Sequence, residues 1–199
     1  MTLDSHINSV EKTVRGDYLV SARHTNTIYL VSGRDRTILW QLGGKESSFS
    51  LKGFQFSSQH DARAASDDVN LSRLTFFDNA ADGKTNSSSQ SSGMLVRLNH
   101  TTMTARLETQ FFAPGGLLSR SQGNVQRLPN GNYFIGWGAE AYVSEHLPDG
   151  TCIFFANFGM DKVSNYRAYK FPWMGLPLDE PTLNATTSSL ASVTEFAVS

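Results

Sequence analysis

The chain has 199 residues, of which 39% are hydrophobic and 18% are charged, and its formal net charge is −1. This balance is typical of a folded globular chain and unlike a disordered one. Because the net charge is near zero, we expect neither nucleic acid nor a membrane surface as a partner. No apolar run approaches the roughly 18 residues that a membrane span needs, and the polar start of the chain carries no signal peptide.

Short apolar runs, rich in aromatic and β-branched residues, alternate with Gly, Asn, Asp and Ser along most of the chain. This pattern predicts β-strands joined by tight turns, and no stretch has the spacing of an amphipathic helix. The runs recur as three units of four strands each. In chain order, the predicted strands are 6–10, 18–22, 27–31 and 37–44; then 59–63, 74–78, 93–98 and 104–108; then 122–126, 133–137, 141–145 and 152–156.

A four-stranded meander that repeats every roughly 50 to 60 residues predicts an all-β fold, a β-propeller of antiparallel blades. The blades cover about residues 5–45, 56–112 and 120–160 of a partial propeller domain, 1–175. We predict a mobile surface loop over residues 82–92, and disorder in the Ser/Thr/Ala-rich tail, 176–199. Three blades do not close a ring, so we expect an incomplete ring that is a fragment or part of an assembly, and self-association through its open edges.

The first strand of each blade lines the central channel of a propeller, and here these segments are polar. The first unit begins with His6 and Asn8, which strand alternation places on one face, and the second begins near His60. Converging imidazoles and amides fit an anion-binding or nucleophilic site. When the two units are aligned, His60 is offset by one residue from His6. The sequence therefore does not decide whether the His60 side chain points into the channel with His6. Polar residues here also commonly join neighbouring blades, and Arg23 also fits a solvated turn.

Other sequence features give weaker indications. His100 and His146 lie beside turns, where we expect surface side chains. No Cys/His cluster has zinc spacing and no Gly-rich loop opens a helix, so the sequence indicates no metal or nucleotide. Glycosylation sequons, which favour a secretory pathway, begin at Asn70, Asn86, Asn99 and Asn184. With no signal peptide, this localisation requires that the chain be the later part of a longer secreted protein.

Several motifs in this order resemble the arylsulfotransferase family, in particular its fungal branch. The matching pieces span about residues 4–173 and are 6–10, 21–24, 38–44, 58–63, 77–79, 121–126, 128–132, 136–138 and 166–173. The resemblance implies a six-bladed propeller that moves a sulfuryl group from an aryl sulfate to a phenolic acceptor, without a nucleotide cofactor. It also implies a further active-site histidine on an earlier blade, which this chain does not contain.

The resemblance assigns roles to four residues. His60, in the segment Ser58-Gln59-His60, matches the nucleophile that becomes a sulfohistidine, and His6 with Asn8 matches the family's His-x-Asn pair. Arg23 matches its active-site arginine. The chemistry suits these residues, because neutral imidazole is a nucleophile near pH 7 and the other three can stabilise charge on sulfuryl oxygens. The alternatives are a non-catalytic ligand-binding propeller and an inactive truncated member of the family.

Overall fold

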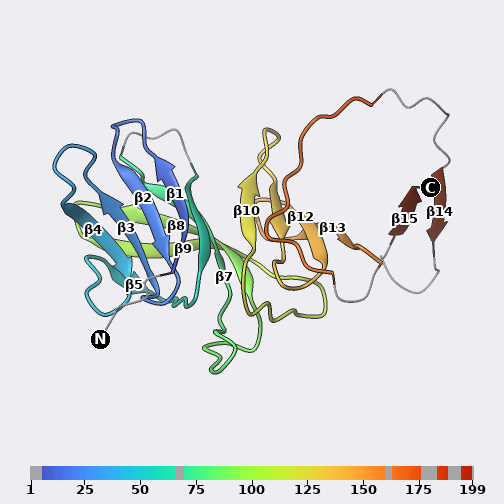
Figure 1. Ribbon diagram of the computed structural model, residues 1–199, viewed down its shortest axis with the longest axis horizontal. Coiled ribbons are helices and arrows are strands. Elements are labelled where there is room, and N and C mark those ends of the chain that lie inside the picture. The colour runs from blue at the N-terminus through green and yellow to red at the C-terminus, as the bar shows by residue number, and fades with distance from the viewer. Residues whose placement is uncertain (1–5, 66–69, 160–162, 176–182, 188–193, 199) are drawn as a thin grey trace.

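The computed structural model describes residues 6–65, 70–159, 163–175, 183–187 and 194–198 of the chain. All the regular structure in these ranges is β-strand, which confirms the predicted all-β class. The same ranges contain no helix long and apolar enough to cross a membrane. Figure 1 shows the sheets side by side, with the N-terminal sheet in blue at one end and the yellow and orange sheet towards the other.

Each of the three predicted units forms an antiparallel sheet with the strand order of a meander, which confirms the propeller blades. The structure adds one strand that the sequence analysis missed, because β5 pairs in parallel with β9 at the outer edge of the second blade. Blade 1 contains β1 (Ile7–Lys12), β2 (Tyr18–Ala22), β3 (Thr27–Val31) and β4 (Ile38–Gly43). Blade 2 contains β5 (Ser50–Lys52), β6 (His60–Ala64), β7 (Arg73–Asp78), β8 (Ser92–Asn99) and β9 (Thr104–Phe111). Blade 3 contains β10 (Asn124–Arg127), β11 (Tyr133–Gly136), β12 (Tyr142–His146) and β13 (Cys152–Asn157).

The turn between β10 and β11 illustrates how the local sequence sets each meander. Gly131 has a φ of +90°, a conformation that side chains disfavour, and open space surrounds the place where a Cβ would lie. Position 131 therefore requires glycine because of its backbone conformation, and not because a side chain would lack space. The Asn130 side chain accepts a hydrogen bond from the Asn132 backbone amide and closes the turn.

The hydrophobic core lies between blades and not within them. One cluster joins blade 1 to blade 2 and includes Leu19, Ile28, Leu74 and Phe76, none of which is exposed to solvent. A second cluster joins blade 2 to blade 3 around Trp137. Since each large apolar side chain contributes roughly 1.5–3 kcal/mol when buried, these two clusters hold the three blades together.

A segment after blade 3 returns along the inner strand of that blade. Residues 163–175 run beside β10, where Asn124 both donates to and accepts from the backbone of Ala168. Gln126 makes the same pair of hydrogen bonds with the backbone of Lys170. These hydrogen bonds tie the segment to β10, and Arg167 within it reaches blades 1 and 2.

Two predictions concern segments outside the blades. The loop predicted over residues 82–92 is exposed over 82–89, where Asp82 accepts hydrogen bonds from the amides of Lys84 and Thr85. Its end is corrected, because Ser91 and Ser92 are fully buried and Ser92 begins β8. In the tail, for which the sequence predicts disorder, β14 (Leu183–Thr187) and β15 (Thr194–Val198) pair as a two-stranded antiparallel sheet. The other residues beyond 175 lie outside the described ranges.

Candidate active site

His6 and His60 lie together at the inner edges of blades 1 and 2. Their ring centroids are 6.0 Å apart, with the rings edge to face, and the ring of His24 lies 4.9 Å from that of His6. Arg23 contributes to the same place through a contact of 3.3 Å between its Nη1 and the Nε2 of His24. We call His6, His24, His60 and Arg23 the histidine cluster.

The backbone explains why the one-residue offset does not separate His6 from His60. His6 has a φ of +41°, and the pairing of β1 with β2 shifts between Ile7 and Ser9, so simple alternation does not apply there. The pairing of β6 with β7 also shifts, just after His60, where Asp61 has a φ of +53°. Left-handed backbone at non-glycine residues costs about 1–3 kcal/mol and is concentrated at functional sites. The predicted alternation from His6 to Asn8 is therefore interrupted.

His60 is held by three hydrogen-bond contacts and is only 4% exposed. Its Nδ1 lies 2.7 Å from Oδ1 of Asn79 and 3.1 Å from the carbonyl oxygen of Ser58. Its Nε2 accepts a longer hydrogen bond, 3.3 Å, from the backbone amide of Gln122. Burial lowers the pKa of His60 to about 4, and the positive charge of Arg23 acts in the same direction. The ring is therefore neutral at neutral pH.

Arg23 connects the histidine cluster to the segment before β10 and lines a groove beside the cluster. Its Nη2 donates to the carbonyl oxygen of Arg120, at 2.8 Å, in the segment before β10. Its Nε is buried and has no hydrogen-bond acceptor among the described residues. An arginine N–H in this state is a donor that an oxyanion can use, because guanidinium groups bind sulfuryl and phosphoryl oxygens strongly.

Asn8 lies in the bridge between the two inner strands. Its side chain donates to the carbonyl oxygen of Gln59 at 2.8 Å and accepts from the amide of Asp61 at 3.1 Å. These bonds hold the backbone on both sides of His60, which is the blade-joining role that the sequence left open. Both ends of the Asn8 amide are therefore occupied by backbone groups. This geometry shows that Asn8 holds the strand that carries His60, whereas a catalytic role of Asn8 stays a prediction.

A buried ion cluster lies behind the bridge. Asp61 is 1% exposed, and its Oδ1 lies 2.6 Å from Arg63 and 3.3 Å from Arg167. Arg167 also donates to the carbonyl oxygen of Asn8, at 2.5 Å. The segment at 163–175 therefore supports, through Arg167, the strands that carry His6 and His60.

Sequence reasoning missed some contributors and misplaced one histidine. Asn79 follows β7 in a segment that carries the family resemblance, but no local pattern shows that it reaches His60. Arg167 is remote in sequence, so only the fold brings it to the site. His100 is exposed as expected, whereas His146 is fully buried, which corrects its predicted surface position. Strand pairing turns His146 into the core, where Ser144 and the Gly150 carbonyl provide its hydrogen bonds.

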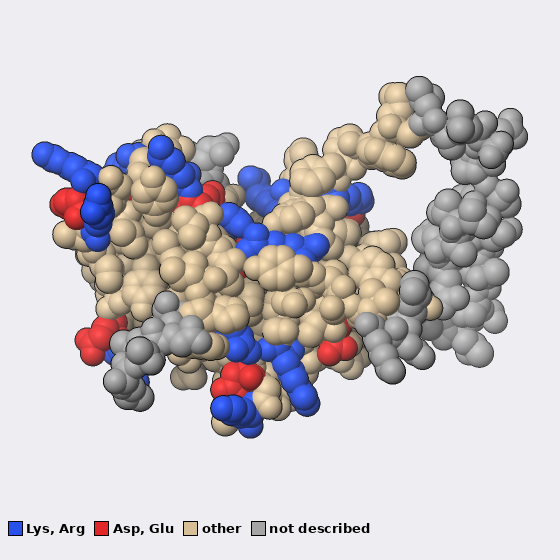
Figure 2. Space-filling view, viewed as in Figure 1, with Lys and Arg blue, Asp and Glu red and all other residues tan. Residues whose placement is uncertain are grey.

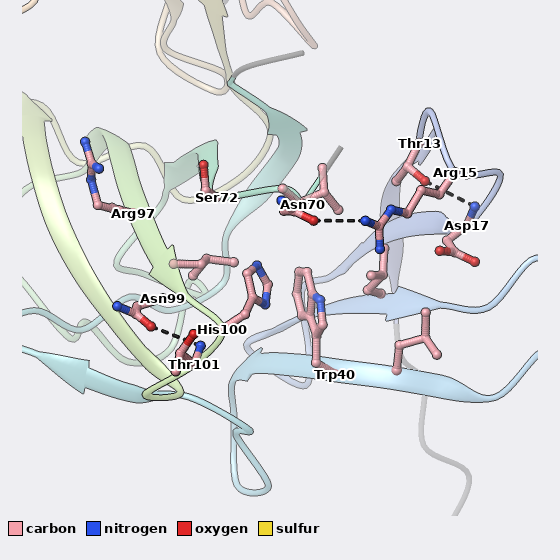
Figure 3. Close-up of a pocket in the computed structure, with 14 residues that line it drawn as sticks. Thr13, Arg15, Asp17, Trp40, Asn70, Ser72, Arg97, Asn99, His100 and Thr101 are labelled. Atoms are coloured by element: carbon pink, nitrogen blue, oxygen red, sulfur yellow. Dashed lines mark hydrogen bonds between the residues drawn. The ribbon is translucent and has the colours of Figure 1, made fainter. Parts of the chain in front are cut away.

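Hollows of the surface lie beside the histidine cluster and away from it, and one of about 560 Å³ between the ends of β3 and β4 contains His24. A groove of about 550 Å³ contains Arg23, His24 and part of the loop at 82–87, so it opens beside the histidine cluster. A pocket of about 610 Å³ lies elsewhere, between blades 1 and 2, with Trp40 and His100 in its wall (Figure 3). None of the four predicted catalytic residues lines that pocket. Among the described residues, no group of three or more His, Cys, Asp or Glu side chains could hold a metal ion.

Comparison with known families agrees with this geometry. A family model described as arylsulfotransferase (ASST) matches residues 4–159. The chain belongs to the arylsulfotransferase family. The search of curated proteins found no match. The part that matches the arylsulfotransferase family contains His6, Asn8, Arg23, His60 and Asn79, whereas Arg167 lies beyond it.

The sequons of this arylsulfotransferase family member are placed as follows. Asn70, Asn86 and Asn99 are exposed. Asn70 accepts a hydrogen bond from Arg15, and Asn99 accepts two from the amides of the turn that follows it. Asn184 belongs to β14, and its side chain is outside the described part of the structure. Three of the four sequons are therefore accessible.

Proposed function

We propose that the chain transfers a sulfuryl group from an aryl sulfate to a phenol through a sulfohistidine on His60. Family membership supports an arylsulfotransferase-type function with these substrate classes. The observation that carries the finer proposal is a buried, neutral His60 beside His6 and Arg23. A neutral imidazole with a lone pair on one nitrogen is a competent nucleophile, and no cofactor is needed for two displacements at sulfur.

The first displacement forms the intermediate. The lone pair on Nε2 of His60 attacks sulfur, the N–S bond forms, and the S–O bond to the aryl group breaks. The departing phenolate takes the bonding electrons and the negative charge. His60 keeps its proton on Nδ1, so the sulfohistidine combines an imidazolium with a sulfonate. We assign His6, whose ring lies 6.0 Å from that of His60, to give a ring proton to the phenolate, which leaves His6 able to take a proton back in the second displacement.

The second displacement reverses these steps with the acceptor. The acceptor phenol gives its proton to His6 as its oxygen attacks sulfur, and the N–S bond breaks to restore neutral His60. Arg23 supports both steps through its unpaired Nε–H, which can donate to a sulfuryl oxygen as charge builds up there. The amide of Gln122 is released from Nε2 by the attack, and it can then donate to the same group.

The proposal has a cellular part, which rests on the accessible sequons at Asn70, Asn86 and Asn99. We place the full-length protein in the secretory pathway, as a glycoprotein that meets phenolic substrates there. Expression in a secreting host and glycosidase treatment test this part, and a chain without glycans would contradict it.

Turnover provides the direct test. The purified chain is incubated with a 4-nitrophenyl sulfate donor and phenol, and both release of nitrophenol and formation of phenyl sulfate are followed. We expect transfer by the wild type, none by His60→Ala, and unchanged transfer by His100→Ala, a control at an exposed histidine outside the cluster. Removing the nucleophile should abolish transfer, whereas Arg23→Ala should slow it by about 10²–10³. Donor binding without turnover in the wild type would indicate a non-catalytic propeller instead.

A further inference from the structure

The buried amide of Asn79 has only one orientation that satisfies its neighbours. Asn79 is 0% exposed, and its Nδ2 lies 2.9 Å from the carbonyl oxygen of Ser119 and 3.0 Å from that of Gln122. Carbonyl oxygens only accept hydrogen bonds, so the NH₂ end of the amide must face them. The opposite end, Oδ1, therefore faces Nδ1 of His60 at 2.7 Å.

This orientation determines which ring nitrogen of His60 carries the proton. Oδ1 of Asn79 only accepts, so Nδ1 of His60 must donate. The Ser58 carbonyl oxygen, 3.1 Å from Nδ1, is also an acceptor. On the other side of the ring, the Gln122 backbone amide can only donate, so Nε2 must accept. Independent contacts on both sides of the ring therefore select the tautomer with a proton on Nδ1 and a lone pair on Nε2.

We infer that Asn79 is a positioning residue, which holds His60 in the tautomer and orientation that present the Nε2 lone pair to sulfur. This inference rests on the proposed sulfuryl transfer. Asn79 does not touch the reacting atoms, and it acts through the ring of His60.

The chemistry of the intermediate suits a neutral amide at this place. As the N–S bond forms, positive charge spreads over the ring, and the Nδ1–H bond to Oδ1 of Asn79 strengthens. A carboxylate there would hold this charge more strongly, but it would also favour a protonated ring before attack. An amide leaves resting His60 neutral, and it leaves the sulfohistidine reactive enough to release its sulfuryl group to the acceptor.

A purely structural role for Asn79 is the competing explanation, because its Nδ2 also anchors the segment that contains Ser119 and Gln122. Asn124 is a matched control for that role. It is equally buried, at 0% exposed, and its amide also makes two hydrogen bonds to backbone, yet no contact joins it to His60. Truncation of either residue removes a buried amide, but only truncation of Asn79 changes the partner of His60.

The test reads the tautomer directly by ¹⁵N NMR of the histidine-labelled chain near pH 7, with the His60 signals assigned by their loss in His60→Gln. In the wild type and in Asn124→Ala, we expect one tautomer, protonated on Nδ1. In Asn79→Ala, we expect a mixture in which part of the protein carries the proton on Nε2. Asn79→Asp keeps the acceptor, so it should keep the proton on Nδ1 and raise the pKa of His60 above that in the wild type.

Turnover separates the inference from the function on which it rests. We expect Asn79→Ala to lower kcat on the order of 10–100-fold, which is the usual effect of removing the hydrogen-bond partner of a metal-bound histidine. Asn79→Asp should recover part of this loss of kcat at pH values above the raised pKa of His60. A wild-type ring protonated on Nε2, or an unchanged tautomer in Asn79→Ala, would overturn the role of Asn79. If the wild-type His60 carries its proton on Nδ1 but no sulfuryl transfer occurs, the proposed function is wrong. The role of Asn79 in selecting the tautomer of His60 then still holds.

Discussion

At the scale of single residues, the environment of each histidine decides what it can do. His60 and His146 are both buried, and burial lowers the pKa of each. Both ring nitrogens of His146 have short partners, Ser144 at 2.8 Å and the Gly150 carbonyl at 3.1 Å. His60 differs because its Nε2 has one long contact and lies beside His6 and Arg23. The sequence motif predicts a role for His60, whereas the burial of His146 depends on strand pairing that no local pattern displays.

Two buried groups give the stability opposite dependences on pH. His60 has a pKa of about 4 in the fold, against an ordinary value of 6.5, so the unfolded chain binds more protons between these values. Stability therefore rises with pH over that range. Burial raises the pKa of Asp78 from 3.8 to about 6, so the folded chain binds more protons there and stability falls as pH rises. In the wild type the two effects largely cancel between about pH 4 and 6.

Conservative substitutions should reveal each dependence separately. Asp78→Asn keeps an oxygen that can accept from the amides of Ser57 and Ala80, as Asp78 does. We expect its free energy of unfolding to rise with pH between about 4 and 6.5, by up to about 1.4 kcal/mol per pH unit. His60→Gln removes the rising contribution of His60, so its free energy of unfolding should rise less with pH, or fall more, than that of the wild type over this range. Urea denaturation at several pH values measures both, and variants with the same pH profile as the wild type would contradict these assignments.

At the scale of elements, hydrogen bonds between inner strands position the site. Asn8 joins β1 to β6, and Asn124 joins β10 to the segment at 163–175 in a similar way. The sequence predicted the blade strands, because alternation, turn residues and repeats are local properties. It did not predict the left-handed residues or pairing shifts beside His6 and His60, because these depend on contacts between blades. It also missed β5, which is only three residues long.

Loss of the Asn8 bridge should weaken the junction of blades 1 and 2. Asn8→Ala removes two buried hydrogen bonds and leaves the Gln59 carbonyl and the Asp61 amide without these partners. We expect a loss of about 2–4 kcal/mol in the free energy of unfolding. Denaturant titration measures it, with Asn99→Ala as the control, because this variant also removes two hydrogen bonds but at the exposed end of β8. Equal stability of the two variants would show that the bridge does not support the strands.

At the scale of the whole molecule, the blades form part of a ring with two different open faces. The outward face of blade 1 exposes Val10 and Ile38 by 53% and 58%, although residues of this kind pack between blades elsewhere in the fold. Beyond blade 3, the segment at 163–175 covers part of the other face and leaves Phe171 and Trp173 exposed by 69% and 89%. Figure 2 shows Lys and Arg side chains across the middle of one side, around β7 and β10, and also at the end of the molecule that blade 1 forms.

These open faces predict that the isolated chain self-associates. Exposed apolar surface and unpaired strand edges favour association, because burying them removes the surface from water. Light scattering combined with size-exclusion chromatography over a range of protein concentrations should show the mean mass rising with concentration. Val10→Glu should reduce this rise. A monodisperse monomer with cooperative unfolding would contradict the prediction.

The covalent intermediate is the central claim, and peptide mass spectrometry after brief exposure of the chain to an aryl sulfate tests it most directly. We predict a sulfuryl group on the peptide that contains His60, its loss when a phenolic acceptor is added, and its absence from His60→Ala. A sulfuryl group on His6 with His60 unmodified would exchange the roles of the two histidines. Transfer between substrates with no modified histidine would contradict a sulfohistidine mechanism.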